Sequence, residues 1–161
     1  MPEHPDAPAS AAAHWPDLAG RLVLAEGRRH HVLPVRVYFE DTDFSGLVYH
    51  ASYVRWCERG RSDFLRLLGN DHRGLIDGSA GREPAAFVVR RMALEFLKPA
   101  RIDEVLEVET RAKELGAAHL VLDQRIMRAG RALFTAEVTV VLVSVSGKPL
   151  RLSQALRGAF G

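Results

Sequence analysis

The strongest constraint on the fold lies in the second half of the chain, where four long segments alternate apolar and polar residues. This alternation predicts strands at residues 86–97, 104–114, 119–128 and 132–145. Short turn sequences separate them, at Pro99-Ala100, Leu115-Gly116 and Ala129-Gly130. Because strands joined by short turns pair as antiparallel hairpins, this half predicts one antiparallel sheet.

A single long helix is predicted before these strands, from about Ala51 to Leu68. Its apolar residues recur at helical spacing and form one face: Tyr53, Trp56, Cys57, Gly60, Phe64, Leu67 and Leu68. Glycine lowers helix propensity by about 1 kcal/mol relative to alanine, so Gly60 in that face indicates close contact with a sheet. With a first strand at Leu33–Phe39 and a closing helix at residues 153–160, the pattern predicts an α+β domain of about five strands.

The first 32 residues differ in composition from the rest of the 161-residue chain. They contain Pro, Ala and His in clusters, and such a segment buries little apolar surface. We therefore expect residues 1–32 to be disordered or loosely docked, and one domain to span residues 33–161. Four histidines of this segment fit no compact set of metal ligands: His4, His14, His30 and His31.

Charge and cysteine content limit the partners and the location. The net charge is +2, and the basic residues form no block, which argues against nucleic-acid binding. Cys57 is the one cysteine, so no intrachain disulfide forms, as is usual in a reducing compartment. No apolar stretch approaches the roughly 20 residues that span a bilayer, and the N-terminus lacks the pattern of a signal peptide. We expect a cytoplasmic protein.

The segment most informative about function is the acidic loop before the helix, Glu40-Asp41-Thr42-Asp43-Phe44-Ser45-Gly46. The first N–H groups of a helix lack intrahelical acceptors, and the helix dipole makes this end partly positive. A carbonyl oxygen bound there would be polarised, and an oxyanion formed on it would be stabilised. A nearby carboxylate would attack the carbonyl or deprotonate a water that does. These are the two parts that acyl hydrolysis requires.

Three other interpretations of the same residues remain open at this point. The acidic and hydroxyl side chains of the loop are also typical of helix caps and turns. Asp41 and Asp43 have the short spacing of some divalent-metal ligands, although no His or Cys set accompanies them. His50 is also consistent with a structural histidine.

The loop closely resembles the active-site stretch of the 4-hydroxybenzoyl-CoA thioesterase family, roughly Asp-x-Asp-x-x-Gly-x-Val-aromatic, here Asp41 to Tyr49. Within that family it is most similar to the acyl-CoA thioesterases associated with the Tol–Pal cluster of Gram-negative bacteria. The resemblance extends over about residues 34–160 and includes residues 38–43, 46–53, 58–61, 87–92, 98–101 and 124–126.

The resemblance implies a hotdog fold, in which a curved antiparallel sheet wraps around a long helix. It implies an acyl-CoA substrate, catalysis by Asp43 as nucleophile or general base, and a main-chain N–H at His50 that polarises the thioester carbonyl. Residues expected to bind substrate are Gly46, Val48, Tyr49, the His50 side chain and, on the phosphates of CoA, Arg90, Arg91, Lys98 and Arg101. Neither a cofactor nor a metal is expected.

The resemblance also implies a homodimer or homotetramer. A sheet with one helix leaves a face and an edge uncovered, which favours the same conclusion. Glu58 and Arg59 match a charged pair of the family, which we interpret as structural. A peripheral link to the cell envelope would rest on the resemblance alone.

Two other functions stay open for a hotdog domain, since a fold does not fix an activity. The first is a hydratase or dehydratase, which uses a histidine–carboxylate pair. In residues 33–161 only His50, His72 and His119 are available, outside the histidine-rich motif of that class. The second is a non-hydrolytic acyl-binding or envelope-complex accessory protein, which would not require the acid at Asp43.

Overall fold

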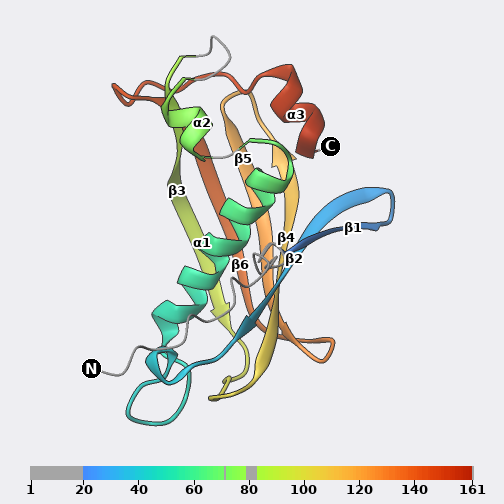
Figure 1. The fold of residues 1–161 in the computed structure, drawn as a ribbon, viewed down its shortest axis with the longest axis vertical. Coiled ribbons are helices and arrows are strands. Elements are labelled where there is room, and N and C mark those ends of the chain that lie inside the picture. Colours follow the sequence, from blue (N-terminus) through green and yellow to red (C-terminus); the bar gives the residue numbers. More distant parts are fainter. Residues whose placement is uncertain (1–19, 71, 79–82, 161) are drawn as a thin grey trace, which may run out of the picture.

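The computed structural model describes residues 20–70, 72–78 and 83–160. One six-stranded antiparallel sheet, in the order β1-β2-β4-β5-β6-β3, curves around the long helix α1 (Figure 1). The strands are β1 (Arg21–Ala25), β2 (Arg28–Arg36), β3 (Ala85–Phe96), β4 (Val105–Leu115), β5 (His119–Arg128) and β6 (Arg131–Ser144). The helices are the 3₁₀ turn η1 (Phe39–Asp41), α1 (His50–Leu67), α2 (His72–Ile76) and α3 (Gln154–Phe160).

Helix α1 packs its apolar face on the concave side of the sheet. Tyr53, Trp56, Cys57 and Phe64 are all buried, and they join the inward residues of β4, β5 and β6 in one core. Gly60 makes the close approach that the sequence predicts. A Cβ at this position would lie 3.0 Å from both Thr110 Oγ1 and Val108 Cγ1, so the helix backbone lies directly against the side chains of β4.

Gln124 of β5 connects the sheet to α1 through side-chain hydrogen bonds. It is fully buried, and its Nε2 donates hydrogen bonds to the Cys57 carbonyl oxygen at 2.9 Å and to Thr110 Oγ1 at 2.8 Å. Its Oε1 accepts a hydrogen bond from Arg61 Nη1 at 2.8 Å. Because a buried amide without partners is costly, this network fixes the position of α1 along the sheet.

The predicted elements of residues 50–160 are confirmed to within one residue at each end. The structure adds the short helix α2, in a segment between the predicted helix and the next strand for which no element is predicted. It also adds the strand β1, so the sheet has six strands where about five were expected.

The expected start of the first strand at Leu33 is wrong. Residues 21–36 form a hairpin, β1 and β2, joined by a turn at Glu26 and Gly27 with φ values of +53° and +74°. Positive φ at both central positions matches the right-handed twist of the flanking strands. The strand ends at Arg36 rather than Phe39, because the chain turns into η1 there. Residues 1–19, with His4 and His14, lie outside the described residues.

Candidate active site

The acidic loop between β2 and α1 folds into a tight turn at residues 43–46. The Gly46 N–H donates to the Asp43 carbonyl oxygen at 3.0 Å, and the Asp43 N–H donates to the Leu47 carbonyl oxygen at 3.0 Å. Gly46 has φ +75°, a conformation that costs glycine little and other residues more. This turn presents the Asp43 side chain at the surface just before the helix.

The segment that follows the turn is anchored to the sheet. Val48 is buried, and its N–H donates to the Ala100 carbonyl oxygen at 2.9 Å. The Ala100 N–H in turn donates to the hydroxyl oxygen of buried Tyr53 at 3.0 Å. Leu47 forms an isolated bridge with Arg101. The loop is therefore held by the turn after β3 and by α1, so the position of Asp43 is determined by long-range contacts.

The two aspartates of the loop have different environments. Asp41 is buried, its Oδ2 accepts the Tyr38 N–H at 2.9 Å, and its carbonyl oxygen accepts the Tyr49 N–H at 2.8 Å. The turn-forming interpretation therefore holds for Asp41. Asp43 instead accepts its hydrogen bonds from Ser45. Among the described residues, no three His, Cys, Asp or Glu side chains form a group that could hold a metal ion.

Asp43 is exposed, and both of its hydrogen bonds come from Ser45. Its Oδ1 accepts the Ser45 N–H at 2.8 Å and the Ser45 hydroxyl. These bonds hold the pKa of Asp43 below its ordinary value, and the nearby His50 lowers it slightly further. The carboxyl group is therefore ionised at neutral pH, with an oriented Oδ1 and an Oδ2 that a bound substrate can approach.

Helix α1 begins at His50, directly after this loop, and no side chain of the described residues caps it at Tyr49. By helix geometry the first N–H groups lack intrahelical acceptors. The His50 ring lies 4.3 Å from the Tyr49 ring and 6.5 Å from the Phe96 ring, measured between centroids. The helix end thus offers N–H donors beside an exposed aromatic surface.

The candidate cations for the CoA phosphates separate into two groups. Lys98 and Arg101 lie in the turn after β3, which bridges to the acidic loop through Leu47. Arg90 and Arg91 lie about six residues earlier on β3, roughly 20 Å along the strand from Phe96. Within one protomer only the first group is near Asp43.

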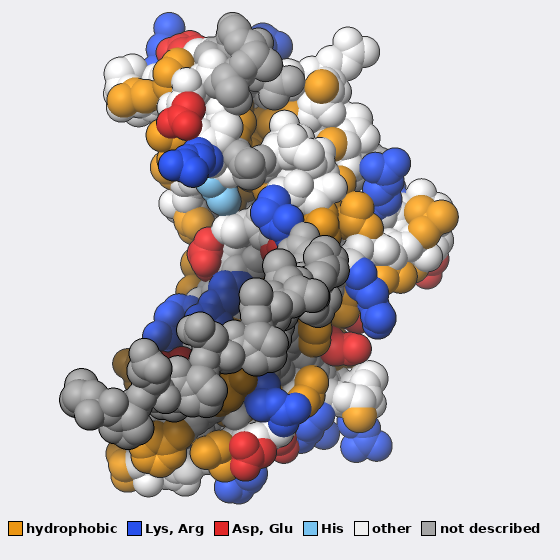
Figure 2. Space-filling model, in the orientation of Figure 1, with side chains coloured by type: hydrophobic (Ala, Val, Ile, Leu, Met, Phe, Trp, Pro, Cys, Tyr) orange, Lys and Arg blue, Asp and Glu red, His pale blue; other side chains and the backbone are white. Residues whose placement is uncertain are grey.

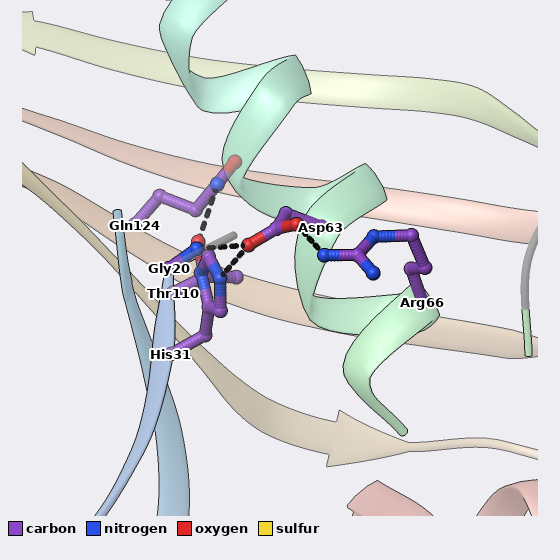
Figure 3. Close-up of polar contacts among 6 residues, drawn as sticks. All are labelled: Gly20, His31, Asp63, Arg66, Thr110 and Gln124. Carbon is purple, nitrogen blue, oxygen red and sulfur yellow. Dashed lines mark hydrogen bonds and ion pairs between the residues drawn. The ribbon is translucent and has the colours of Figure 1, made fainter. Parts of the chain in front are cut away.

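A buried histidine–carboxylate pair was not found from the sequence (Figure 3). His31 of β2 is fully buried, and its Nε2 lies 2.7 Å from Asp63 Oδ2 of α1. The same carboxylate accepts the Gly20 N–H at 2.6 Å and bonds Arg66 Nη2 through Oδ1 at 2.9 Å. The sequence signal that could have revealed the β1–β2 hairpin, and with it the position of His31, is a pair of apolar runs at residues 22–25 and 32–35, on either side of Glu26-Gly27.

Burial lowers the pKa of His31 against the raising effect of Asp63, and His31 Nδ1 has no hydrogen-bond partner among the described residues. A protonated ring would place a second N–H there without an acceptor, so the neutral form is favoured. With His31 enclosed and Asp63 committed to three donors, this pair is structural rather than a hydratase dyad.

Three of the four remaining residues of the prediction, Glu58, His72 and His119, bond locally. Glu58 Oε1 accepts a hydrogen bond from the Ser62 hydroxyl, whereas Arg59 is exposed. His72 Nε2 lies 3.0 Å from Ser62 Oγ, and His119 Nε2 lies 3.3 Å from Glu114 Oε1. Glu58 thus has a local contact with Ser62, and the structural role of Glu58 and Arg59 stays a prediction.

Comparisons with known proteins identify the family of the chain. The family model described as the Thioesterase superfamily matches residues 45–135. The acyl-CoA thioester hydrolase YbgC of Escherichia coli O6:H1 is 43% identical over 129 residues, which are 79% of this chain and 92% of that protein. The acyl-CoA thioesterase YbgC of Haemophilus influenzae is 38% identical over 128 residues, 79% of this chain and 91% of that protein.

Among solved structures, a probable thioesterase from Bartonella henselae has a TM-score of 0.74 and 44% identity, covering 77% of this chain and 99% of that one. In the part of the chain that the structure describes, no helix has the length and apolar character to cross a membrane. The predicted hotdog fold and the resemblance to thioesterases are confirmed, and the chain belongs to the thioesterase superfamily.

Proposed function

We propose that the chain hydrolyses acyl-CoA thioesters, with Asp43 as the catalytic carboxylate and the N-terminus of α1 as the oxyanion site. One observation carries this: the turn of residues 43–46 holds an exposed carboxylate with a lowered pKa, shortly before helix α1, which begins at His50 without a side-chain cap from Tyr49. The relatives named acyl-CoA thioester hydrolase support the reaction class. Because the family match begins at Ser45, the role of Asp43 rests on the loop geometry and on the motif.

In this reaction the thioester carbonyl oxygen accepts a hydrogen bond from the main-chain N–H of His50. The partial positive charge of the helix end stabilises the negative charge that develops on that oxygen. Asp43 then attacks the carbonyl carbon and expels CoA as the thiolate, forming an anhydride that water hydrolyses, or it deprotonates a water that attacks instead. Both routes yield the free acid and CoA, and both require an ionised Asp43.

The lowered pKa of Asp43 does not separate the two routes. The Ser45 hydrogen bonds that stabilise the carboxylate make it both a weaker base and a weaker nucleophile. A single turnover in ¹⁸O-labelled water can establish the nucleophilic route, because only that route can place label in Asp43. Attack of water on the Asp43 carbon of the anhydride leaves label in the Asp43 peptide, whereas the general-base route labels only the released acid.

The surroundings of Asp43 suggest how the rest of the substrate binds. Tyr49 and the His50 ring would contact the acyl group beside Val48 and Gly46, and Lys98 with Arg101 would neutralise phosphates of CoA. CoA is part of the substrate, so no cofactor enters the reaction. The edge strand β3 carries exposed Val88 and Val89, which supports a homo-oligomer formed through that edge. A cytoplasmic location and an envelope link stay predictions.

The test is release of free thiol from a panel of short, long and aromatic acyl-CoA esters. We expect the wild type to hydrolyse at least one class, Asp43→Asn to lose that activity, and Glu40→Gln to keep it. Glu40 is the matched control, because it is another exposed acid of the same loop. Absence of thiol release by the folded wild type with every ester would contradict the proposal and favour an acyl-binding role.

A further inference from the structure

The last residue of β3, Phe96, lies against the first turns of α1. Its ring is 6.5 Å from the His50 ring and 5.7 Å from the Tyr53 ring between centroids, both in edge-to-face geometry. Such contacts are favourable, because the positive edge of one ring meets the negative face of the other. The Phe96 ring therefore lies beside the helix end that the proposed reaction uses as its oxyanion site.

The sheet also holds Phe96 in this place. It pairs with Phe134 of β6 across the two strands, and the ring centroids are 5.0 Å apart. The strand ends directly after it, where the N–H groups of Leu97 and Lys98 both donate to the Leu133 carbonyl oxygen, at 2.8 and 3.1 Å. The ring is therefore positioned by β3, β6 and α1 together.

One side of the Phe96 ring meets the core and the other is open. Tyr53 and Phe134 are 3% and 0% exposed, whereas Phe96 is 52% exposed. Tyr49, whose ring lies 4.3 Å from that of His50, is also 44% exposed. Figure 2 shows hydrophobic side chains gathered at the lower end of the molecule, where Figure 1 places the start of α1. An apolar group that enters beside this helix end meets Phe96 first and a closed core behind it.

The acyl chain of the proposed substrate begins at this place. With the thioester carbonyl oxygen on the main-chain N–H of His50, a short acyl group packs against the open side of Phe96. A longer chain directed toward the sheet is stopped by the ring, because Tyr53 and Phe134 fill the space behind it. Room for a single methylene in an apolar pocket changes kcat/KM by roughly 10- to 200-fold.

We propose that Phe96 sets the upper limit of acyl-chain length by closing the inner end of the acyl site beside His50. The inference rests on the proposed function, because it takes the N-terminus of α1 as the place where the thioester binds. Phe96 determines specificity in this account and takes no part in making or breaking bonds.

The test is the dependence of kcat/KM on chain length, measured with straight-chain acyl-CoA esters. We expect Phe96→Ala to raise kcat/KM by at least about tenfold for esters longer than the best wild-type substrate. Phe96→Trp should move the optimum to shorter chains. Phe96→Leu keeps a larger apolar side chain and should give a smaller shift toward longer chains, which tests the proposal even where the alanine variant does not fold.

Leu97→Ala is the matched control. Leu97 is the next residue, it is 50% exposed, and the alternation of an extended chain directs it away from α1. We expect its removal to leave the length profile unchanged.

Binding of S-alkyl-CoA thioethers of the same chain lengths separates this proposal from the proposed function, since a thioether has no carbonyl to hydrolyse. Tighter binding of long chains by Phe96→Ala than by the wild type would support the length limit even if no ester were hydrolysed. That combination would contradict the proposed hydrolysis alone.

Three results would overturn the role of Phe96. One is a length profile, in turnover and in thioether binding, that Phe96→Ala leaves unchanged or that Leu97→Ala shifts equally. Another is a uniform loss at every chain length in the Phe96 variants, which would make the ring a structural contact of α1 only. The third is a wild type that binds no thioether of any length.

Discussion

Asp43 and Asp63 show two uses of the same chemical group. Each is a carboxylate that accepts main-chain and side-chain hydrogen bonds, and each has a pKa below its ordinary value. The donors to Asp43 both belong to Ser45, two residues away, and the side chain is exposed. The donors to Asp63 come from Gly20, His31 and Arg66, and only 14% of its side chain is exposed.

This difference supports the proposal that Asp43 is available for catalysis and Asp63 is not. A carboxylate held by a local turn keeps one oxygen accessible, and its removal leaves no distant group without a partner. A carboxylate that joins β2, α1 and the N-terminal segment has its oxygens occupied, and its removal leaves buried donors unpaired. Lowered pKa alone does not distinguish a reactive acid from a structural one; exposure and the origin of the donors do.

Substitution of the two acids by alanine should therefore affect stability very differently. Asp63→Ala leaves His31 and the Gly20 N–H without their acceptor, so we expect the free energy of unfolding to fall by about 1–3 kcal/mol. Asp43→Ala removes only exposed, local bonds and should change it by less than about 0.5 kcal/mol. Urea denaturation of both variants measures this, and an equal loss for the two would contradict the comparison.

The His31–Asp63 pair should also make stability depend on pH. Because the folded-state pKa of His31 lies below the ordinary 6.5, the unfolded chain takes up the proton first as the pH falls. The contribution of neutral His31 is therefore fully present above pH 6.5 and is lost as the pH falls below it.

The measurement is the free energy of unfolding between about pH 7.5 and pH 5.5, compared with His31→Gln. Glutamine retains a donor for Asp63 without titrating, so we expect a smaller decline in the variant. Parallel declines in the two proteins would show that other groups cause the pH dependence.

The smallest expected effect concerns Ser45. Ser45→Ala removes the hydroxyl donor to Asp43, so the pKa of Asp43 should rise and the acid limb of the activity profile should move to higher pH. At neutral pH Asp43 stays ionised, and we expect turnover within about tenfold of wild type. The pH dependence of kcat/KM checks this. An acid limb that does not move would show that Asp43 is not the group whose ionisation limits activity at low pH. Thr42→Ala is the matched control.

The site was predictable from the sequence where the signal is local. Asp43, Gly46 and the helix start form one short motif, and the turn that joins them is closed by bonds between near neighbours. The anchoring of that turn was not predictable, because Ala100 and Tyr53 meet it through the fold. The position of Arg90 and Arg91 away from Asp43 likewise follows from the length of β3 rather than from any motif.

The N-terminal hairpin was missed for a related reason. Its turn is Glu26-Gly27 rather than the Asn-Gly or Asp-Gly typical of hairpins, and its strands carry charged and histidine residues. His31 acquires its partner 32 residues later in the chain, and its burial depends on α1 lying across β2. A histidine in a polar segment gives no sign of this, because long-range pairing decides its environment.

The most direct test of the account is to measure turnover and thermal stability on the same two variants, Asp43→Asn and Asp63→Asn, with an acyl-CoA ester that the wild type hydrolyses. We expect Asp43→Asn to lose about 10²- to 10⁴-fold in kcat/KM with an unchanged melting temperature. Asp63→Asn should melt earlier and, where folded, keep turnover within about tenfold. Near-normal turnover in Asp43→Asn would contradict the central claim that this carboxylate performs the chemistry.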